Sequence, residues 1–170
     1  SFREYFRTLQ SETALRDLWT RLLYVEQPWH RDVALSPAIG ELARTWPDRP
    51  PVIIDESDAD PASLPAALAL GYAGTSHKNC KGVLKTLVNA GLLARRRAEG
   101  LPAVLSGEDL ANVGPISTLQ DLAAQAALGV TSVERNGHHY FAGLAQFPAS
   151  LREHALRWHP DLYAADPARS

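Results

Sequence analysis

Ionisable side chains stand at the ends of five short apolar segments of the chain. The segments begin near residues 22, 51, 72, 102 and 130, and the polar residues that follow them are Glu26; Asp55 and Glu56; His77 and Lys78; Glu108 and Asp109; and Glu134 and Asn136. Carboxylate oxygens are the ligands that Mg²⁺ prefers, in an octahedron completed by water or substrate oxygens. A lysine that is partly removed from water beside a cation has a lowered pKa and can act as a general base. The residue types therefore indicate Glu26 and Asp55 as metal ligands and Lys78 as a base.

These groups together suit one kind of reaction. A metal ion that binds a substrate carboxylate stabilises the enolate that forms when the neighbouring proton leaves. The set therefore predicts proton abstraction next to a carboxylate, with Glu108, Asp109 and Glu134 lining the substrate site. A single polar residue after a strand is an ordinary feature of loops, but five in succession favour a common site.

The apolar segments are expected to form the strands of a parallel sheet. Segments 22–25, 51–54, 72–77, 102–106 and 130–134 alternate with helical patterns over 36–46, 60–71, 81–97 and 114–129. Such alternation is typical of α/β folds, in which the carboxyl ends of all parallel strands meet at one edge. The spacing suits a (β/α) barrel or a doubly wound sheet. No glycine-rich phosphate-binding motif follows any strand, which weakens a nucleotide-binding interpretation.

The composition is that of an ordinary globular domain of 170 residues. The chain is 45% hydrophobic, with a net charge of −2 and a pI of about 6.3, which argues against a nucleic-acid partner. Its single cysteine, Cys80, excludes an intrachain disulfide. No apolar run reaches the roughly 20 residues that span a membrane. We expect one domain in the cytoplasm, without a membrane partner.

The motifs "VEQPWHRD", "PVIIDES" and "SHKNCKG", in that order, resemble the enolase superfamily. The chain is similar to the C-terminal part of the barrel in its mandelate racemase/muconate lactonizing branch. The resemblance implies strands four to eight of an eight-stranded (β/α) barrel. It also implies Glu26 and Asp55 as Mg²⁺ ligands, Lys78 as the catalytic acid/base and a small carboxylate substrate. The implied reactions are racemisation, cycloisomerisation or dehydration, by an isomerase or lyase. The pairing of a lysine base with Mg²⁺ in this superfamily is an established mechanism.

Other residues near these motifs are weaker candidates. Lys81 is a rival for the role of Lys78, but it falls at the start of a predicted helix, where a solvated lysine is expected. His77 alternates with Lys78 along the strand and should face the helix layer. His138 and His139 are candidates for substrate contacts after the fifth strand, against an ordinary surface or packing role.

The resemblance covers only part of the family's architecture. Residues 1–170 lack counterparts of the N-terminal capping domain and of the first barrel strands, and the absence of methionine indicates a piece of a longer protein. We therefore expect the isolated chain to be inactive and to bind Mg²⁺ weakly. Exposed barrel edges predict a homo-oligomer. The alternative is a non-catalytic barrel fragment, or an α/β binding module, that self-associates.

Overall fold

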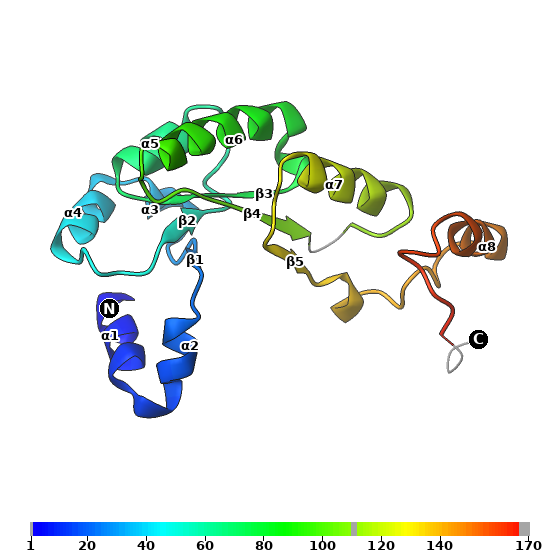
Figure 1. Ribbon diagram of the computed structural model, residues 1–170, viewed down its shortest axis with the longest axis horizontal. Helices are drawn as coiled ribbons and strands as arrows, with labels where there is room; N and C mark the ends of the chain where they lie inside the picture. Colours follow the sequence, from blue (N-terminus) through cyan, green and yellow to red (C-terminus); the bar gives the residue numbers. More distant parts are fainter. Residues whose placement is uncertain (1, 110–111, 167–170) are drawn as a thin grey trace. The chain divides into compact units, whose positions relative to one another are not determined.

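The computed structural model describes residues 2–109 and 112–166, apart from the side chains of Asp109 and His138. It divides into two compact units, Ser1–Ser106 and Gly107–Ser170. Its five strands form one sheet in the order β1-β2-β3-β4-β5 (Figure 1). The strands are β1 Val25–Glu26, β2 Val52–Ile54, β3 Gly74–His77, β4 Val104–Asp109 and β5 Val133–Arg135. Every predicted apolar segment therefore contains or adjoins a strand, although the strands begin one to three residues later.

The strands pair in the parallel sense. β1 pairs with β2 and β2 with β3 in the first unit, and β4 pairs with β5 in the second. Neighbours in the sheet are also neighbours along the chain, so each connection crosses to the adjacent strand. A doubly wound sheet instead reverses its strand order at one point. The α/β class is confirmed, and the consecutive order is compatible with part of a (β/α) barrel.

Helices connect the strands in the expected places. They are α1 Phe2–Ser11, α2 Arg16–Thr20, α3 Arg31–Ala34, α4 Pro37–Thr45, α5 Ser63–Ala69, α6 Val83–Ala98, α7 Ile116–Ala127 and α8 Ala149–Trp158, with short 3₁₀ turns at Thr13–Leu15, Asn79–Lys81 and Gly137–His139. The N-terminal segment forms two helices, α1 and α2, because a 3₁₀ turn at Thr13–Leu15 separates them. Helix α4 begins at Pro37, and Ser36 stands at its N-cap position without a side-chain capping hydrogen bond.

The core of the first unit lies between β2 and the helices α4 and α5. Val52, Ile54, Ala67 and Tyr72 are buried together, and Val25, Trp29, Leu35, Ile39 and Leu70 pack against them. The hydroxyl of Tyr72 donates a hydrogen bond of 2.6 Å to the carbonyl of Ala34, so its polar atom is satisfied inside the core. This core anchors β2, the strand that carries Asp55 at its end.

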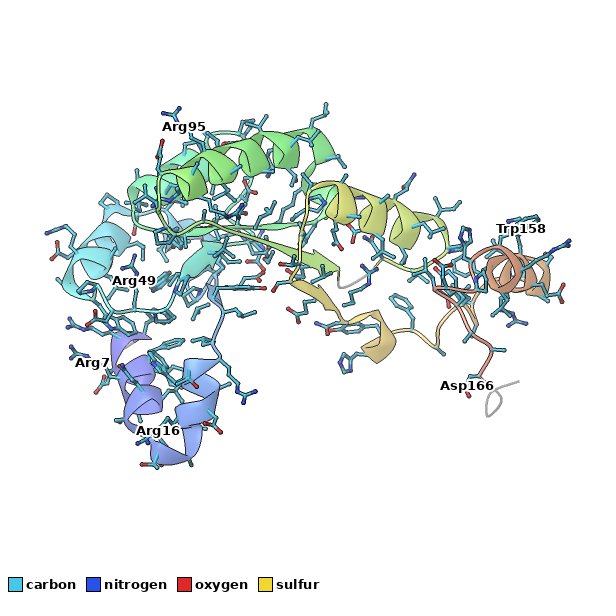
Figure 2. The ribbon with its side chains drawn as sticks, in the orientation of Figure 1. Arg7, Arg16, Arg49, Arg95, Trp158 and Asp166 are labelled. Carbon is cyan, nitrogen blue, oxygen red and sulfur yellow. The ribbon has the colours of Figure 1, made fainter. Side chains whose placement is uncertain are left out.

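Two backbone positions in the first unit demand glycine. Gly71 follows α5 with φ +92°, a left-handed conformation that commonly ends helices at glycine. Arg49, labelled in Figure 2, donates hydrogen bonds to the carbonyls of Gly71, Ala43 and Trp46 and so ties this turn to the end of α4. Gly74 begins β3 where a Cβ would collide with the backbone of Val104, so only glycine lets these segments approach.

The long helix α6 does not bury its apolar side. The sequence groups Val83, Leu84, Leu87, Val88 and Leu92 on one face, yet the exposed fractions of Leu84, Leu87 and Val88 are 79%, 51% and 55%. The buried residues of α6 are Thr86, Asn89 and Leu93. Their polar groups have hydrogen-bond partners on β3 and on the loop after β2, which accounts for the reversed face. In the second unit, α7 likewise buries Asp121 and Gln125 while Ile116 is exposed.

No helix within the described part of the chain is long and apolar enough to cross a membrane.

Candidate metal centre

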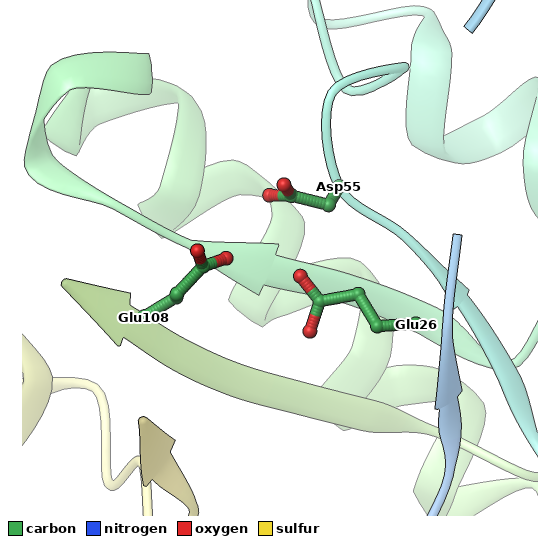
Figure 3. Close-up of side chains that lie close together, drawn as sticks. All are labelled: Glu26, Asp55 and Glu108. Carbon is green, nitrogen blue, oxygen red and sulfur yellow. The ribbon is translucent and has the colours of Figure 1, made fainter. Parts of the chain in front are cut away.

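Three acidic side chains gather at the carboxyl edge of the sheet. Glu26 ends β1, and Asp55 follows the last residue of β2. Glu108 lies in β4, in the part of that strand that belongs to the second unit. Each offers a carboxylate oxygen, and these oxygens lie within 4.8 Å of one another (Figure 3). Parallel pairing places Glu26 opposite Ile53, so β1 and β2 end at the same edge of the sheet. Glu26, at the end of β1, and Asp55, just after β2, therefore lie at that edge.

Asp55 is a buried carboxylate that three side-chain donors hold in place. Its exposed fraction is 3%, and three donors from β3 and the turn after it surround it. Lys78 Nζ lies 3.0 Å from Asp55 Oδ2, while Lys81 Nζ and the hydroxyl of Ser76 both donate to Oδ1. Ser76 and His77 end β3, and Lys78 follows them. Because successive side chains point to opposite sides of a strand, Ser76 and Lys78 lie on the side of Asp55, and His77 lies on the other. The local geometry thus brings two cations onto one buried carboxylate.

The electrostatics of Asp55 follow from these contacts. Burial by itself would raise the pKa of Asp55, because it disfavours the charged form. The hydrogen bonds from Lys81 and Ser76, the charge of Lys81 and the hydrogen bond from Lys78 outweigh burial and lower the pKa to about 2. Asp55 is therefore ionised over the whole physiological range and is ready to act as an anionic ligand.

The lowered pKa of Asp55 predicts a loss of stability in acid. Its pKa is about 2 in the folded protein against an ordinary value of 3.8. Above about pH 4 the folded state gains about 2 kcal/mol from this difference, and the gain is lost as the pH falls from about 4 to about 2. The free energy of unfolding of the protein, minus that of Asp55→Asn, should therefore shrink over this window in urea titrations. Glu56→Gln, which changes the exposed neighbouring carboxylate, should keep the wild-type profile. A difference that does not vary with pH would contradict the prediction.

His77 turns away from the carboxylates, as its alternation with Lys78 predicts. The ring is buried, with Nδ1 at 2.8 Å from the hydroxyl of Thr86 in α6 and Nε2 at 3.0 Å from Oδ1 of Asn79. These contacts fasten α6 and the turn after β3 to the strand. The role of His77 is thus to hold in place the segment that presents the two lysines.

The remaining predicted site residues belong to the second unit. Glu134 lies in β5 opposite Glu108 of β4; it is exposed and accepts a hydrogen bond from the amide of Asn136. Asp109 ends β4 opposite Arg135, but its side chain lies outside the described part of the structure, as does that of His138. His139 is exposed. The substrate-binding roles of Glu108, Asp109 and Glu134 remain predictions.

Two residues have places that sequence reasoning did not give them. Lys81, expected to be solvated, has a side-chain exposed fraction of 12% and bonds Asp55 and Ser76. Its spacing of three residues from Lys78, across a predicted strand-to-helix turn, was the available signal. Glu108, expected to contact substrate, joins the two predicted metal ligands. A carboxylate at the end of a third strand could have been assigned to the same group.

No protein-family model matches this chain, and no curated protein matches it.

Proposed function

We propose that this chain is a segment of an enzyme that removes the proton next to the carboxylate of a small organic acid, with Mg²⁺ held by Glu26 and Asp55 and with Lys78 as the acid/base. The observation that supports this most is the shared position of Asp55. It lies beside the Glu26 carboxylate and also within 3.0 Å of Lys78 Nζ. A metal ligand and a proton carrier thus lie within reach of one substrate. The proposal places the protein with the enolase superfamily, whose motifs it resembles, as an isomerase or lyase.

The donor set suits Mg²⁺ rather than a softer ion. Glu26, Asp55 and Glu108 offer only carboxylate oxygens, which hard cations prefer over the imidazole and thiolate ligands typical of zinc sites. Three carboxylates leave positions of an octahedron for water or substrate oxygens. When bound, Mg²⁺ supplies positive charge that stabilises negative charge developing on the substrate carboxylate. Glu108 is in this proposal a third ligand, in addition to the two that the sequence indicated.

The two lysines take different parts in the proposal. Lys81 Nζ donates to Asp55 Oδ1 and, at 3.1 and 2.9 Å, to the carbonyl and hydroxyl oxygens of Ser76. An ammonium group has three N–H donors, so these acceptors use all of them and hold Lys81 as a fixed cation. Lys78 has a side-chain exposed fraction of 19%, against 12% for Lys81, and approaches Asp55 from the end of β3. Lys78 is therefore the lysine better placed to exchange a proton with substrate at Nζ.

Direct metal titration tests the proposal. The protein should bind Mg²⁺, and Mn²⁺ as a probe, whereas Glu26→Gln and Asp55→Asn should each weaken binding by about a hundredfold, because each removes one anionic ligand. Isothermal titration calorimetry measures the affinities. Glu56→Gln, beside Asp55 but exposed, is the matched control and should bind as the parent does. Equal affinities in all four proteins would rule out this metal centre.

A second candidate function is self-association as a non-catalytic binding module. The observation that favours it is the exposed apolar side of α6, where Leu84, Leu87 and Val88 are more than half exposed. Apolar side chains grouped in this way on a surface are typical of interaction sites. Light scattering separates the two functions. A monomer that binds Mg²⁺ favours the enzyme, and an oligomer that binds no metal favours the module.

A further inference from the structure

Gln27 follows the candidate ligand Glu26 and has an unusual backbone. Its φ is +25°, and it is the one non-glycine residue with a positive φ among those the structure describes. A side chain with a Cβ rarely adopts this conformation, and such outliers persist where surrounding contacts impose them. Its backbone N–H continues the sheet ladder, donating to the carbonyl of Ile53 at 2.9 Å. The contacts that Gln27 makes should therefore impose this conformation.

The side chain of Gln27 reaches across to the loop that carries Asp55. Its amide oxygen accepts two backbone hydrogen bonds, from the N–H of Asp55 at 2.7 Å and from the N–H of Ser57 at 3.0 Å. Asp55 also begins a turn, because its carbonyl accepts from the N–H of Asp58 at 2.9 Å. One oxygen atom thus fixes both ends of the segment Asp55–Ser57.

Few side chains could make this contact. The atom must accept two hydrogen bonds and must lie at the end of a chain long enough to cross from β1 to β2. A carbonyl oxygen has two lone pairs, and glutamine carries one on three side-chain carbons. Asparagine is one methylene shorter, and the side chains of methionine and leucine offer no comparable acceptor. Asp55 and Ser57 are both buried, so unpaired N–H groups there would be costly.

We propose that Gln27 is a positioning residue that locks the Asp55–Ser57 turn to the end of β1 and so sets the place of the Asp55 carboxylate beside that of Glu26. The backbone segments that carry the two candidate ligands are then connected through the Gln27 side chain. Glu26 precedes Gln27 in the chain, and Asp55 is held by the Gln27 amide. The consequence for metal binding rests on the proposed function, whereas the lock itself does not.

Amide hydrogen exchange in the metal-free protein tests the lock. In Gln27→Met, which keeps the side-chain length without the acceptor, the amides of Asp55 and Ser57 should exchange about tenfold faster or more. Gln27→Glu keeps two acceptor lone pairs and should retain the protection. Gln125→Met is the matched control, because Gln125 is a buried glutamine whose side-chain amide likewise makes a hydrogen bond, donating to Asp121 at 2.9 Å. It should leave the amides of Asp55 and Ser57 unchanged.

Manganese titration of the same variants tests the consequence. Gln27→Met should weaken Mn²⁺ binding about tenfold or more, while Gln125→Met should not. Unchanged exchange of both amides in Gln27→Met would overturn the lock, whatever the metal does. Faster exchange with unchanged Mn²⁺ affinity would overturn the positioning of Asp55 for the metal. A parent protein that binds no Mn²⁺ would overturn the proposed function alone, because the exchange data still decide whether Gln27 holds the turn.

Discussion

Replacing Lys78 by alanine in the complete enzyme is expected to slow the exchange of a substrate's α-proton by about 10²- to 10⁴-fold, the usual contribution of a positioned acid or base. The reason is the place of its ammonium group. Lys78 Nζ lies 3.0 Å from Asp55 Oδ2, next to the carboxylates proposed to hold the metal. The rate can be measured by NMR as loss of the α-proton signal in D₂O, with a panel of small carboxylic acids.

Two measurements separate proton transfer from binding in this variant. Lys78→Ala should bind Mn²⁺ within a few-fold of the parent, since it removes no ligand, whereas Asp55→Asn should lose binding. An added small primary amine should restore part of the exchange rate in Lys78→Ala, because it returns the missing base. Near-normal exchange in Lys78→Ala, on an acid that the parent turns over, would contradict the role of Lys78.

Lys81 is the other lysine beside Asp55 that could act as the base. It contacts the same carboxylate, and its side chain is the less exposed of the two. Lysine side chains act as bases where a proton can leave and return, which three fixed acceptors oppose. Lys81 is thus suited to keeping Asp55 ionised. Restored exchange by added amine in a Lys81 variant, and not in Lys78→Ala, would reverse the assignment.

The residues at the carboxyl edge of the sheet could be predicted from the sequence, because their positions depend on local sequence patterns. Short apolar runs locate strands, and parallel strands end at one edge, so the residue after each run has a defined place. The positions of Glu26 and Asp55 follow from this rule together with the consecutive strand order. Turn geometry is a different matter. Lys81 reaches Asp55 only because the chain makes a 3₁₀ turn at Asn79–Lys81, which no periodicity indicates.

The orientation of α6 could not be predicted from hydrophobicity. Its apolar residues recur at helical spacing, and a pattern rule turns that side toward the sheet. The structure instead buries Thr86 and Asn89, because β3 and the loop after β2 present polar partners to the helix. Asn89 Nδ2 donates to Asp58 Oδ2 at 3.1 Å, and Thr75 of β3 donates to the same oxygen at 3.0 Å. Polar satisfaction across elements decided the face, and such pairings are invisible in a single segment.

Asp58 is the centre of this buried polar layer and the place where a substitution should cost most. Its side chain is 2% exposed and pairs at 3.1 Å with Lys85 of α6, which is 9% exposed. Asp58→Ala removes the carboxylate that pairs with the buried ammonium group of Lys85 and accepts from Thr75 and Asn89. We expect the free energy of unfolding to fall by about 3–5 kcal/mol, the usual cost of breaking a buried ion pair from one side. Urea denaturation measures it.

A double-mutant cycle shows whether the charge pair itself carries this cost. Asp58→Asn and Lys85→Met each leave one buried charge without its partner, whereas the double variant leaves neither. The double variant should therefore be destabilised by about 1–3 kcal/mol less than the two single effects added together. The exposed pair Glu41–Arg44, with side chains 58% and 74% exposed, is the control, and its cycle should give less than about 1 kcal/mol. Additive effects at Asp58 and Lys85 would show that their charges do not hold α6 to the loop after β2. The packing of Thr86, Asn89 and Leu93 would then be what fixes the helix that follows Lys78 and Lys81.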